Sequence, residues 1–346
     1  MFSCLSIRLR PPSTFRERNP VGYRGVVFLL IALLLTGCIG PKTQPLNHQV
    51  ITPTFNSNHF ISDDGYRLPF RQYFPDQAPD TIVIALHGFN DYSIAFEKLC
   101  QAMLRAKIAC LAYDQRGFGA TRHTGLWPPE GRLQRDLEAV VTLVRHRYPE
   151  ARIFLSGESM GAAVIMTALA SDAYRVDENI TGAILLAPAV WARATQPWYQ
   201  RWLLSLAVYT VPGWKPTGEG LEIQATDNIE ALRKMARDPL VIKATRIDAI
   251  YGLTNLMDKA LEVSGSLRSD TLVMYGERDE VIPKSPTCEM LAAMKTKAVP
   301  FDFVLYPEGY HMLSRDLQAE QVFKDMIQWM QHQKIPTGTL DPDDFC

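Results

Sequence analysis

Residues 153–170, with the sequence IFLSGESMGAAVIMTALA, decide the fold of this chain. They combine a short apolar strand, a tight turn with the pattern G-x-S-x-G at Gly157–Gly161, and a helical stretch that follows directly. A strand, a sharp turn and a helix in this order predict a nucleophile elbow. Such an elbow presents Ser159 at the start of a helix, whose N–H groups and dipole favour negative charge. A surface turn rich in small residues is the alternative interpretation.

The rest of the chain places this turn in an alternation of strands and helices. Short runs that are apolar at nearly every position are typical of strands buried on both faces. These strands are expected at residues 81–86, 109–113, 153–156, 183–186, 271–275 and 301–306. Helical patterns are expected at residues 94–106, 133–148, 159–173 and 316–333. A hairpin that turns at Asp63-Asp64-Gly65 precedes them. The alternation predicts an α/β fold with a mostly parallel sheet flanked by helices.

One connection in this alternation is too long for a simple crossover. After residue 190, 80 residues pass before the next predicted strand begins. We therefore expect residues 191–254 to form an inserted helical cap over a core made of residues 59–190 and 255–335. The remaining residues, 336–346, are expected to form a polar and mobile tail.

The first part of this cap is rich in tryptophan. Four of the six tryptophans of the chain lie there, at positions 191, 198, 202 and 214. Most of their surface should form the core of the cap, but a subdomain of about 60 residues buries proportionally little surface. We expect the remainder, with Trp198 and Trp202, to line a groove for medium or long acyl chains.

A serine nucleophile needs a base, and the base needs a carboxylate that orients it. Of the seven histidines, only His311 lies in the loop after the last predicted strand, which makes it the candidate base. A buried packing histidine is the alternative. The strand at 271–275 leads into Glu277, Asp279 and Glu280, and Asp279 stands just before an apolar pair. Asp279 is therefore the predicted partner of His311, and a charged surface loop is the alternative.

The anionic intermediate of such a reaction needs two backbone donors. One is the N–H of Met160, the residue after the nucleophile. The other is expected from the loop His87-Gly88-Phe89-Asn90, which follows an early strand. We predict that the Phe89 N–H donates and that His87 is structural.

Composition excludes several classes of protein. With 36 basic and 37 acidic side chains the formal net charge is −1, so no basic excess exists to bind nucleic acid. Apolar types make up 47% of the residues, which excludes a disordered chain. The six cysteines contain no pair with zinc-ligand spacing, and neither a metal nor an organic cofactor is expected. Cys100 and Cys110 are expected to be buried and structural, and whether they pair is left open.

The first 37 residues have the pattern of a secretory signal peptide. Five arginines and one glutamate precede an apolar run at 26–35, which is shorter than the ~20 residues of a membrane-spanning helix. The next residues, Leu35-Thr36-Gly37-Cys38, resemble the lipobox of bacterial lipoproteins. The resemblance implies that Cys38 becomes a lipidated N-terminus. A signal without lipidation is the alternative.

Lipidation would fix the cellular location of the chain. Removal of residues 1–37 would leave 31 basic and 36 acidic side chains, so electrostatics would not hold the protein on an anionic membrane. A lipid anchor would hold it instead, through a flexible tether at residues 38–58. The expected location is the bacterial cell envelope, at the periplasmic side of the outer membrane.

Taken together, these residues resemble the α/β-hydrolases of the monoacylglycerol lipase and lysophospholipase branch, which are also called serine-aminopeptidase-like hydrolases. The matching segments are, in the order of the family, His87–Phe89, Asp114–Gly119, Gly157–Gly161, Gly276–Asp279 and Tyr306–His311. The resemblance implies Ser159 as nucleophile, His311 as base, Asp279 as its partner and a helical cap over the site. It further implies hydrolysis of carboxylic esters, most simply monoacylglycerols or lysophospholipids, through an acyl-enzyme on Ser159.

Two other functions fit the same residues. One is the hydrolysis of another ester, a thioester or a small peptide, because one fold supports many substrates. The other is a non-catalytic lipoprotein of the envelope that binds a ligand with an inactive hydrolase fold. The intact set of Ser159, Asp279 and His311 argues against the second. The expected partners are a small lipid or ester and a membrane, and the sequence leaves the oligomeric state open.

Overall fold

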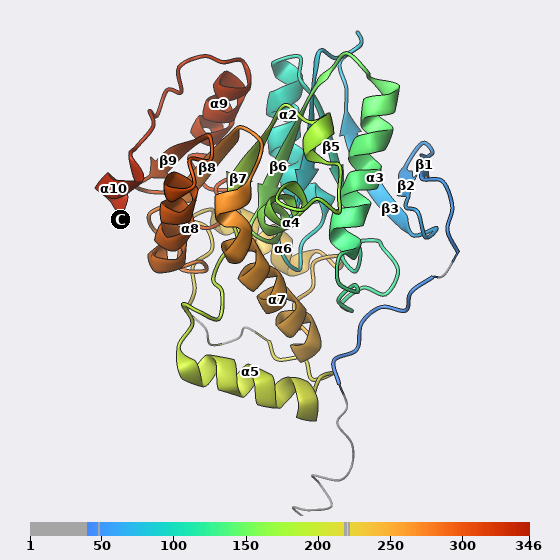
Figure 1. The fold of residues 1–346 in the computed structure, drawn as a ribbon, viewed down its shortest axis with the longest axis vertical. Coiled ribbons are helices and arrows are strands. Elements are labelled where there is room, and N and C mark those ends of the chain that lie inside the picture. The colour runs from blue at the N-terminus through green and yellow to red at the C-terminus, as the bar shows by residue number, and fades with distance from the viewer. Residues whose placement is uncertain (1–39, 48, 218–219, 221) are drawn as a thin grey trace, which may run out of the picture. The chain divides into compact units, whose positions relative to one another are not determined.

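A nine-stranded sheet organises the part of the chain that this computed structural model describes, residues 40–346 apart from 48, 218–219 and 221 (Figure 1). The predicted signal peptide at 1–37 and Cys38 lie outside the described residues. The strand order is β1-β2-β3-β5-β4-β6-β7-β8-β9. The strands are β1 (Thr54–Phe55), β2 (His59–Ile61), β3 (Arg67–Tyr73), β4 (Thr81–Leu86), β5 (Ala109–Tyr113), β6 (Arg152–Glu158), β7 (Gly182–Leu186), β8 (Thr271–Gly276) and β9 (Phe301–Tyr306).

Strands β4 to β9 run parallel, as their apolar sequences predict. Only the first three strands run antiparallel: β1 pairs with β2, β2 with β3, and β3 with β5. The sequence of β4 explains its central place, because alternate side chains belong to two different apolar clusters. Ile82, Ile84 and Leu86 lie in one cluster, and Val83 and Ala85 lie in the other. Parallel strands place their carboxyl ends at one edge of the sheet.

Helices cover both faces of the sheet (Figure 1). The α2 and α9 helices share one apolar cluster with the sheet, while α3, α4, α7 and α8 share the other. The helices are α2 (Glu97–Arg105), α3 (Arg132–Arg147), α4 (Met160–Leu169), α5 (Trp198–Thr210), α6 (Ile229–Arg237), α7 (Ile247–Val263), α8 (Lys284–Thr296), α9 (Ala319–Met330) and α10 (Pro342–Phe345). Three short 3-10 turns are η1 (Ser93–Phe96), η2 (Asp177–Asn179) and η3 (Ser264–Ser266). In these residues no helix is long and apolar enough to cross a bilayer.

The long insertion is helical, but residue 254 is not a break in the structure. It lies inside α7, a continuous helix that packs along α4 of the core and also contacts α5. Gly252 of α7 lies so close to Trp127 that a Cβ there would fall 2.3 Å from the indole ring. The α7 helix therefore joins the core to the cap, and α5 and α6 are the helices of the cap proper.

The segment expected as a free tether is docked over most of its described length. Gln44 is 2% exposed, its N–H donates to the carbonyl of Trp127 at 2.9 Å, and its side-chain amide donates to the carbonyl of Leu126 at 2.7 Å. Further along, the Ile51 N–H donates to the Asp63 carbonyl at 2.7 Å. Individual polar contacts hold this segment, and such contacts leave no helical or strand period in the sequence.

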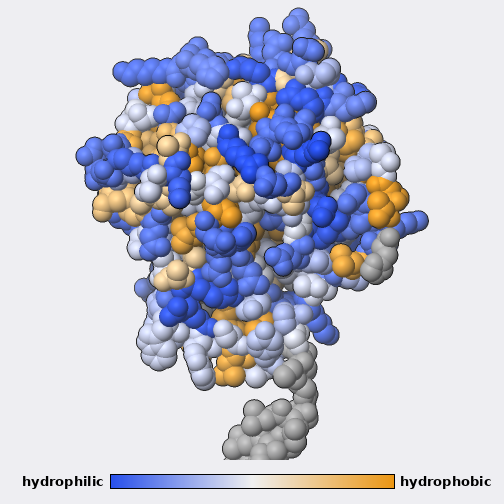
Figure 2. All heavy atoms as spheres, in the orientation of Figure 1, coloured by the Kyte–Doolittle hydropathy of each residue, from blue (hydrophilic) through white to orange (hydrophobic). Residues whose placement is uncertain are grey.

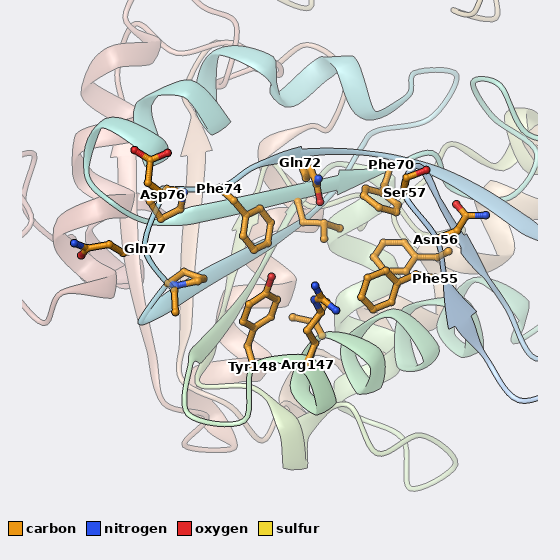
Figure 3. A pocket seen from close by; sticks show the side chains of 16 residues that line it. Phe55, Asn56, Ser57, Phe70, Gln72, Phe74, Asp76, Gln77, Arg147 and Tyr148 are labelled. Atoms are coloured by element: carbon orange, nitrogen blue, oxygen red, sulfur yellow. The ribbon is translucent and has the colours of Figure 1, made fainter.

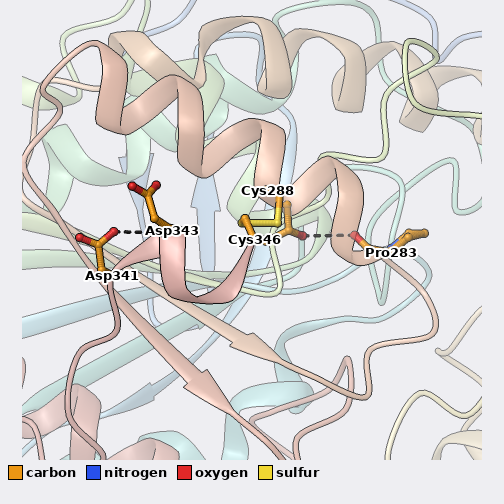
Figure 4. Close-up of a disulfide and its surroundings, with 6 residues drawn as sticks. Pro283, Cys288, Asp341, Asp343 and Cys346 are labelled. Carbon is orange, nitrogen blue, oxygen red and sulfur yellow. Dashed lines mark hydrogen bonds between the residues drawn. A yellow bond between two sulfur atoms is a disulfide. The ribbon is translucent and has the colours of Figure 1, made fainter.

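The C-terminal tail is also held in place, contrary to the expectation of a mobile end (Figure 4). Phe345 of α10 is buried against Tyr275 and Phe303. The last residue, Cys346, forms a disulfide with Cys288 of α8. The Lys295 ammonium contacts the carboxylates of Asp341 and Asp343, each at 2.8 Å. The polar composition of the tail does not indicate these contacts, because each involves a residue that is distant in the sequence.

A second disulfide joins Cys100 of α2 to Cys110 of β5. Both cysteines are buried, as expected, in the cluster under α2 and α9. The sequence left their pairing open, and the structure shows that they pair. Disulfides are typical of proteins that fold in an oxidising compartment.

Candidate active site

Ser159 is the single residue of a sharp turn between the end of β6 and the start of α4. Its φ of 54° and ψ of −112° lie outside the regions that a residue with a side chain prefers. Its N–H donates to the Leu186 carbonyl at 2.9 Å, and its own carbonyl accepts from Ala189 at 3.1 Å. The turn is thus tied to the end of β7. This strained geometry is the strand–turn–helix of a nucleophile elbow rather than a loose surface turn.

The glycines on either side of Ser159 are required by close packing. A Cβ on Gly157 would lie 2.4 Å from the backbone nitrogen of Ala162. A Cβ on Gly161 would lie 2.0 Å from the carbonyl oxygen of Leu86 in β4. Both distances are far below a normal contact, so the G-x-S-x-G pattern follows from how tightly α4 sits on the sheet.

His311 and Asp279 form a buried pair at the carboxyl edge of the sheet. Nδ1 of His311 lies 2.8 Å from Oδ2 of Asp279, and the two residues are 5% and 8% exposed. The other carboxylate oxygen of Asp279 accepts the N–H groups of Val281 and Ile282, both at 2.8 Å. The loops that carry the pair follow the adjacent strands β8 and β9. The carboxylate is therefore fixed, and it orients the imidazole through Nδ1–H.

The two competing carboxylates of this segment point elsewhere. Glu277 and Glu280 are exposed. Glu280 accepts the N–H of Gln224 from the cap at 2.7 Å, and Arg278 pairs with Glu308 rather than with either of them. Of the three acids in the segment, Asp279 is the one that contacts His311.

The surroundings of His311 raise its pKa above that of a histidine in water. Burial lowers its pKa, but the Coulombic attraction and hydrogen bond of Asp279 outweigh burial, and the pKa is raised overall. Glu158 raises the pKa further, while Arg315 lowers it. An imidazole with this environment readily accepts a proton at neutral pH.

The two segments that carry the predicted donors to an anionic oxygen both lie next to Ser159. Met160 is the first residue of α4 and is buried. Phe89 follows β4, and the preceding Gly88 lies next to Ser159, since a Cβ on Gly88 would lie 3.6 Å from Cβ of Ser159. The loop at 87–90 and the start of α4 thus meet at Ser159. An oxyanion hole formed by Phe89 and Met160 requires these two segments to meet.

His87 shapes this loop and stays neutral. It is fully buried, with Nδ1 2.8 Å from the Gly88 carbonyl, while Nε2 accepts the Gln115 N–H at 2.9 Å. Burial lowers its pKa. Both ring nitrogens are engaged by backbone, as expected of a structural residue.

The sequence did not reveal a buried ion network that joins the segments carrying Phe89, Ser159 and His311. The guanidinium of Arg315 donates to Asp91 at 2.6 Å and to Glu158 at 2.7 Å. Glu158 also accepts from the Ser314 hydroxyl at 2.5 Å. Asp91 follows the Phe89 loop, Glu158 precedes Ser159, and Arg315 follows His311 by four residues. Proximity to the motifs was the only sequence signal, and it does not show which charges pair.

The second part of the insertion lies over these loops. The Ile242 N–H donates to the Asn90 carbonyl and the Met312 N–H donates to the Ala225 carbonyl, both at 2.9 Å. The Asn228 amide donates to the Arg315 carbonyl, also at 2.9 Å. A cavity of about 350 Å³ lies between α6 and the η1–α2 segment, with Asp91 and Arg315 in its wall. The cap is thus in direct contact with the segments that carry Phe89 and His311.

The tryptophans expected to line an acyl groove are not buried. Trp198 is 72% exposed and Trp202 is 67% exposed, so in this structure they do not form the core of the cap. The reason is that α5 packs on α7 through a narrow stripe in which Val208 is the buried residue.

A separate hollow of about 520 Å³ lies away from these loops (Figure 3). Its walls come from β1 to β3 and from the end of α3, with Phe70, Phe74, Arg147 and Tyr148 turned toward it. None of the predicted catalytic side chains lines it. In the described part of the chain, no group of three or more His, Cys, Asp or Glu side chains is placed to hold a metal ion.

Comparison with known proteins identifies relatives. The family model described as serine aminopeptidase, S33, matches residues 77–318. The monoglyceride lipase of Rattus norvegicus is 22% identical over 303 residues, which cover 86% of this chain and 96% of that protein. The monoacylglycerol lipase of Mycolicibacterium smegmatis is 22% identical over 81% of this chain and 99% of its own length.

A solved structure shows the same fold. A soluble variant of monoglyceride lipase from Saccharomyces cerevisiae, in complex with a substrate analogue, superposes with a TM-score of 0.67 at 20% identity. The superposition covers 83% of this chain and 98% of that one. The predicted α/β-hydrolase fold is confirmed.

Proposed function

The chain belongs to the serine aminopeptidase (S33) family of hydrolases, and from this premise we propose that it hydrolyses monoacylglycerols or lysophospholipids with Ser159 as nucleophile. The observation that carries the proposal is the buried pair of His311 and Asp279, at the same edge of the sheet as the strained turn of Ser159. A base that is oriented by a fixed carboxylate is what a serine hydroxyl needs to become nucleophilic.

The proposed mechanism is acyl transfer in two steps. Nε2 of His311 takes the proton of Ser159 as the hydroxyl oxygen attacks the ester carbonyl, and the N–H groups of Phe89 and Met160 stabilise the oxyanion. The alcohol then leaves with the proton from His311. In the second step water, activated by His311, attacks the acyl-enzyme and releases the fatty acid and free Ser159. No step requires a metal or an organic cofactor.

The proposed substrate class rests on the relatives. Two of them are named for hydrolysis of monoacylglycerols, and both align over more than four-fifths of this chain.

We also propose that Cys38 carries lipid and anchors the protein at the periplasmic side of the outer membrane. The support is the Leu35-Thr36-Gly37-Cys38 pattern behind an apolar run. The two disulfides of the described residues favour an exported protein, because the cytosol keeps thiols reduced.

A labelling experiment tests the chemistry. A fluorophosphonate probe should modify the wild-type protein at Ser159 and leave Ser159→Ala unmodified. A panel of monoacylglycerols, lysophospholipids, short nitrophenyl esters and peptide amides then ranks the substrates. Highest kcat/KM on a peptide amide would overturn the lipid assignment while keeping the nucleophile. An unmodified Cys38 in the mature N-terminal peptide, found by mass spectrometry, would overturn lipidation.

A further inference from the structure

The loop of Asp279 is bonded to a tyrosine that the mechanism does not use. Tyr275 is the last residue but one of β8 and is 1% exposed. Its hydroxyl donates to the carbonyl of Ile282 at 2.8 Å. The N–H of the same Ile282 donates to Oδ1 of Asp279, also at 2.8 Å. One residue of the loop is therefore held by the phenol at its carbonyl and by the carboxylate at its N–H.

The hydroxyl of Tyr275 keeps its proton and stays a donor. Burial and the nearby carboxylate of Asp279 raise the pKa of Tyr275 above that of a tyrosine in water. Ile282 is 3% exposed, so little solvent reaches this hydrogen bond. Without the hydroxyl, a buried carbonyl would lose its donor, and the peptide that supports Asp279 would be less firmly placed.

The C-terminal tail packs on the ring of this tyrosine. The ring centroids of Tyr275 and Phe345 lie 5.7 Å apart, and the ring of Phe303 in β9 lies 5.4 Å from that of Phe345. The ammonium of Lys284, the first residue of α8, lies 4.3 Å from the centroid of the Phe345 ring. Phe345 thus contacts β8, β9 and the start of α8 together.

A disulfide holds Phe345 at this place. Cys346, the next residue, is bonded to Cys288 of α8 (Figure 4). The α8 helix begins at Lys284, two residues after Ile282. The segment that supports Asp279 therefore continues directly into the helix that carries the cysteine bound to the tail.

The tail needs this covalent link because little else in α10 is apolar. Phe345 is the buried residue of this four-residue helix, while Asp341, Asp343 and Asp344 are exposed. In Figure 2 the left edge of the molecule, where α10 lies in Figure 1, is accordingly mostly blue. Burial of one ring does not outweigh the conformational entropy of ordering four residues, so docking of α10 depends on the disulfide.

We propose that Tyr275 is a positioning residue for Asp279, and that Phe345, bound through the Cys288–Cys346 disulfide, keeps the Tyr275 hydroxyl within reach of Ile282. The inference rests on the proposed function, because it assigns a role to residues that support the same pair of Asp279 and His311. A carboxylate that is less firmly placed orients the imidazole less well and attracts its proton less strongly.

The NMR titration of His311 tests this positioning without any substrate. In protein labelled at histidine Cε1, the signal of His311 is the one that is lost in His311→Gln. Besides burial, the groups that set its pKa are Asp279 after β8, Glu158 at the end of β6 and Arg315 on its own loop. Tyr275→Phe removes the hydroxyl and keeps the ring, so it should lower the pKa of His311 relative to the wild type.

Kinetics on a soluble ester give a second readout. Tyr275→Phe should lower kcat about threefold to tenfold, which is the effect of one lost hydrogen bond on a rate. KM should stay the same, because no substrate contact is removed, and the acid limb of kcat/KM should move to lower pH. Cys288→Ser combined with Cys346→Ser should change both quantities in the same direction but by less, because the hydroxyl is still present.

Two matched controls separate positioning from a loss of stability. Tyr113→Phe removes the hydroxyl of another tyrosine that is 1% exposed, at the end of β5, which three strands separate from β8. Cys100→Ala combined with Cys110→Ala removes the other disulfide. Both controls should keep the kcat of the wild type and the pKa of His311, even where thermal unfolding occurs at a lower temperature.

Three results would count against these assignments. An unchanged His311 titration and an unchanged kcat in folded Tyr275→Phe would overturn the role of Tyr275. A wild-type titration in the variant without Cys288 and Cys346 would overturn the role of the tail. Failure of the wild-type protein to hydrolyse any ester would overturn the proposed function, whereas the titration of His311 would still test positioning, because it does not depend on turnover.

Discussion

The carboxyl edge of the sheet and the α5 helix differ in how far their functional or aromatic side chains are buried. At the edge, Asp279, His311 and Arg315 are at least nine-tenths buried, and each is held by specific polar partners. On α5, Trp198 and Trp202 are mostly exposed. Chemistry needs groups fixed within a fraction of an ångström, whereas an exposed side chain of α5 has no packing partner that fixes its position. Substitutions at the edge of the sheet should therefore lower activity or stability strongly, and substitutions on the exposed side of α5 should have small effects.

The largest effect should come from Ser159→Ala. Loss of the nucleophile in a triad enzyme lowers turnover by about 10⁶-fold, and here it should leave the fold intact because Ala adds no atom to the turn. The measurement is kcat on a soluble ester together with thermal unfolding. A contaminant-free variant that retains more than a few per cent of the wild-type rate would show that the edge is not catalytic in the way proposed.

Asp279→Asn should have the next largest effect. An amide cannot orient the imidazole in the tautomer that accepts the Ser159 proton, and the analogous change costs about 10⁴-fold in turnover. Glu277→Gln and Glu280→Gln are the matched controls, since both side chains are exposed, and each should lower the rate only slightly. A large loss from either control, with Asp279→Asn near normal, would reverse the assignment.

The network behind the site should affect both stability and pH dependence. Arg315→Met leaves Asp91 and Glu158 buried without their cation, and breaking a buried ion pair in this way costs about 3–5 kcal/mol in the free energy of unfolding. Glu158→Gln should cost less, because a neutral amide still accepts from Ser314 and Arg315. Chemical denaturation measures both.

The pH profile distinguishes an electrostatic role from a purely structural one. The charged groups around His311 are Asp279 after β8, Glu158 at the end of β6, and Arg315 on its own loop. Only neutral His311 acts as base, so activity is lost as the pH falls through its raised pKa. Glu158→Gln removes a charge that raises this pKa and should move the acid limb of kcat/KM to lower pH, and Arg315→Met should move it to higher pH.

A second titrating group needs its own control. Burial raises the pKa of Asp316 to about 6, in the same range as a histidine. The acid limb should remain in Asp316→Asn if it belongs to His311. If the acid limb of kcat/KM moved in the same direction in Glu158→Gln and Arg315→Met, the network would not act on His311 through its charges and would have only a structural role.

The smallest effect should come from Trp202→Ala. The side chain is 67% exposed, so its loss should change the free energy of unfolding by less than about 0.5 kcal/mol and leave the rate on a soluble ester unchanged. Val208→Ala, on the buried side of the same helix, should cost about 1–3 kcal/mol. If Trp202→Ala instead flattened the preference for longer acyl chains, the indole would belong to the substrate groove after all.

Much of the fold could be predicted because it depends on local patterns. The six parallel strands are where short apolar runs predicted them, with β6 extended by one residue at its start and by two at its end. The helices α2, α3, α4 and α9 lie inside or close to their predicted ranges. Strand and helix periods are properties of neighbouring residues, so they are visible without knowing the fold.

The errors all involve contacts between residues that are distant in the sequence. The docked segment around Gln44 depends on Trp127, the anchored tail depends on Cys288 and Tyr275, and the network depends on which carboxylates reach Arg315. Most of the tryptophan surface was expected to form the core of the cap, and Trp198 and Trp202 were expected to line a groove. Burial, however, is decided by whether another element packs on that side of the helix.

The sequence by itself determined the alternation of strands and helices, the elbow at Ser159 and the chain order of Ser159, Asp279 and His311, because the spacing of neighbouring residues sets all of these. The tertiary structure alone decided that the guanidinium of Arg315 joins Asp91 and Glu158, and so ties together the segments that carry Phe89, Ser159 and His311. It also decided that one side of α5 is left uncovered. Charges pair and apolar faces are buried according to distance in space, and folding sets those distances only when the whole sheet is assembled.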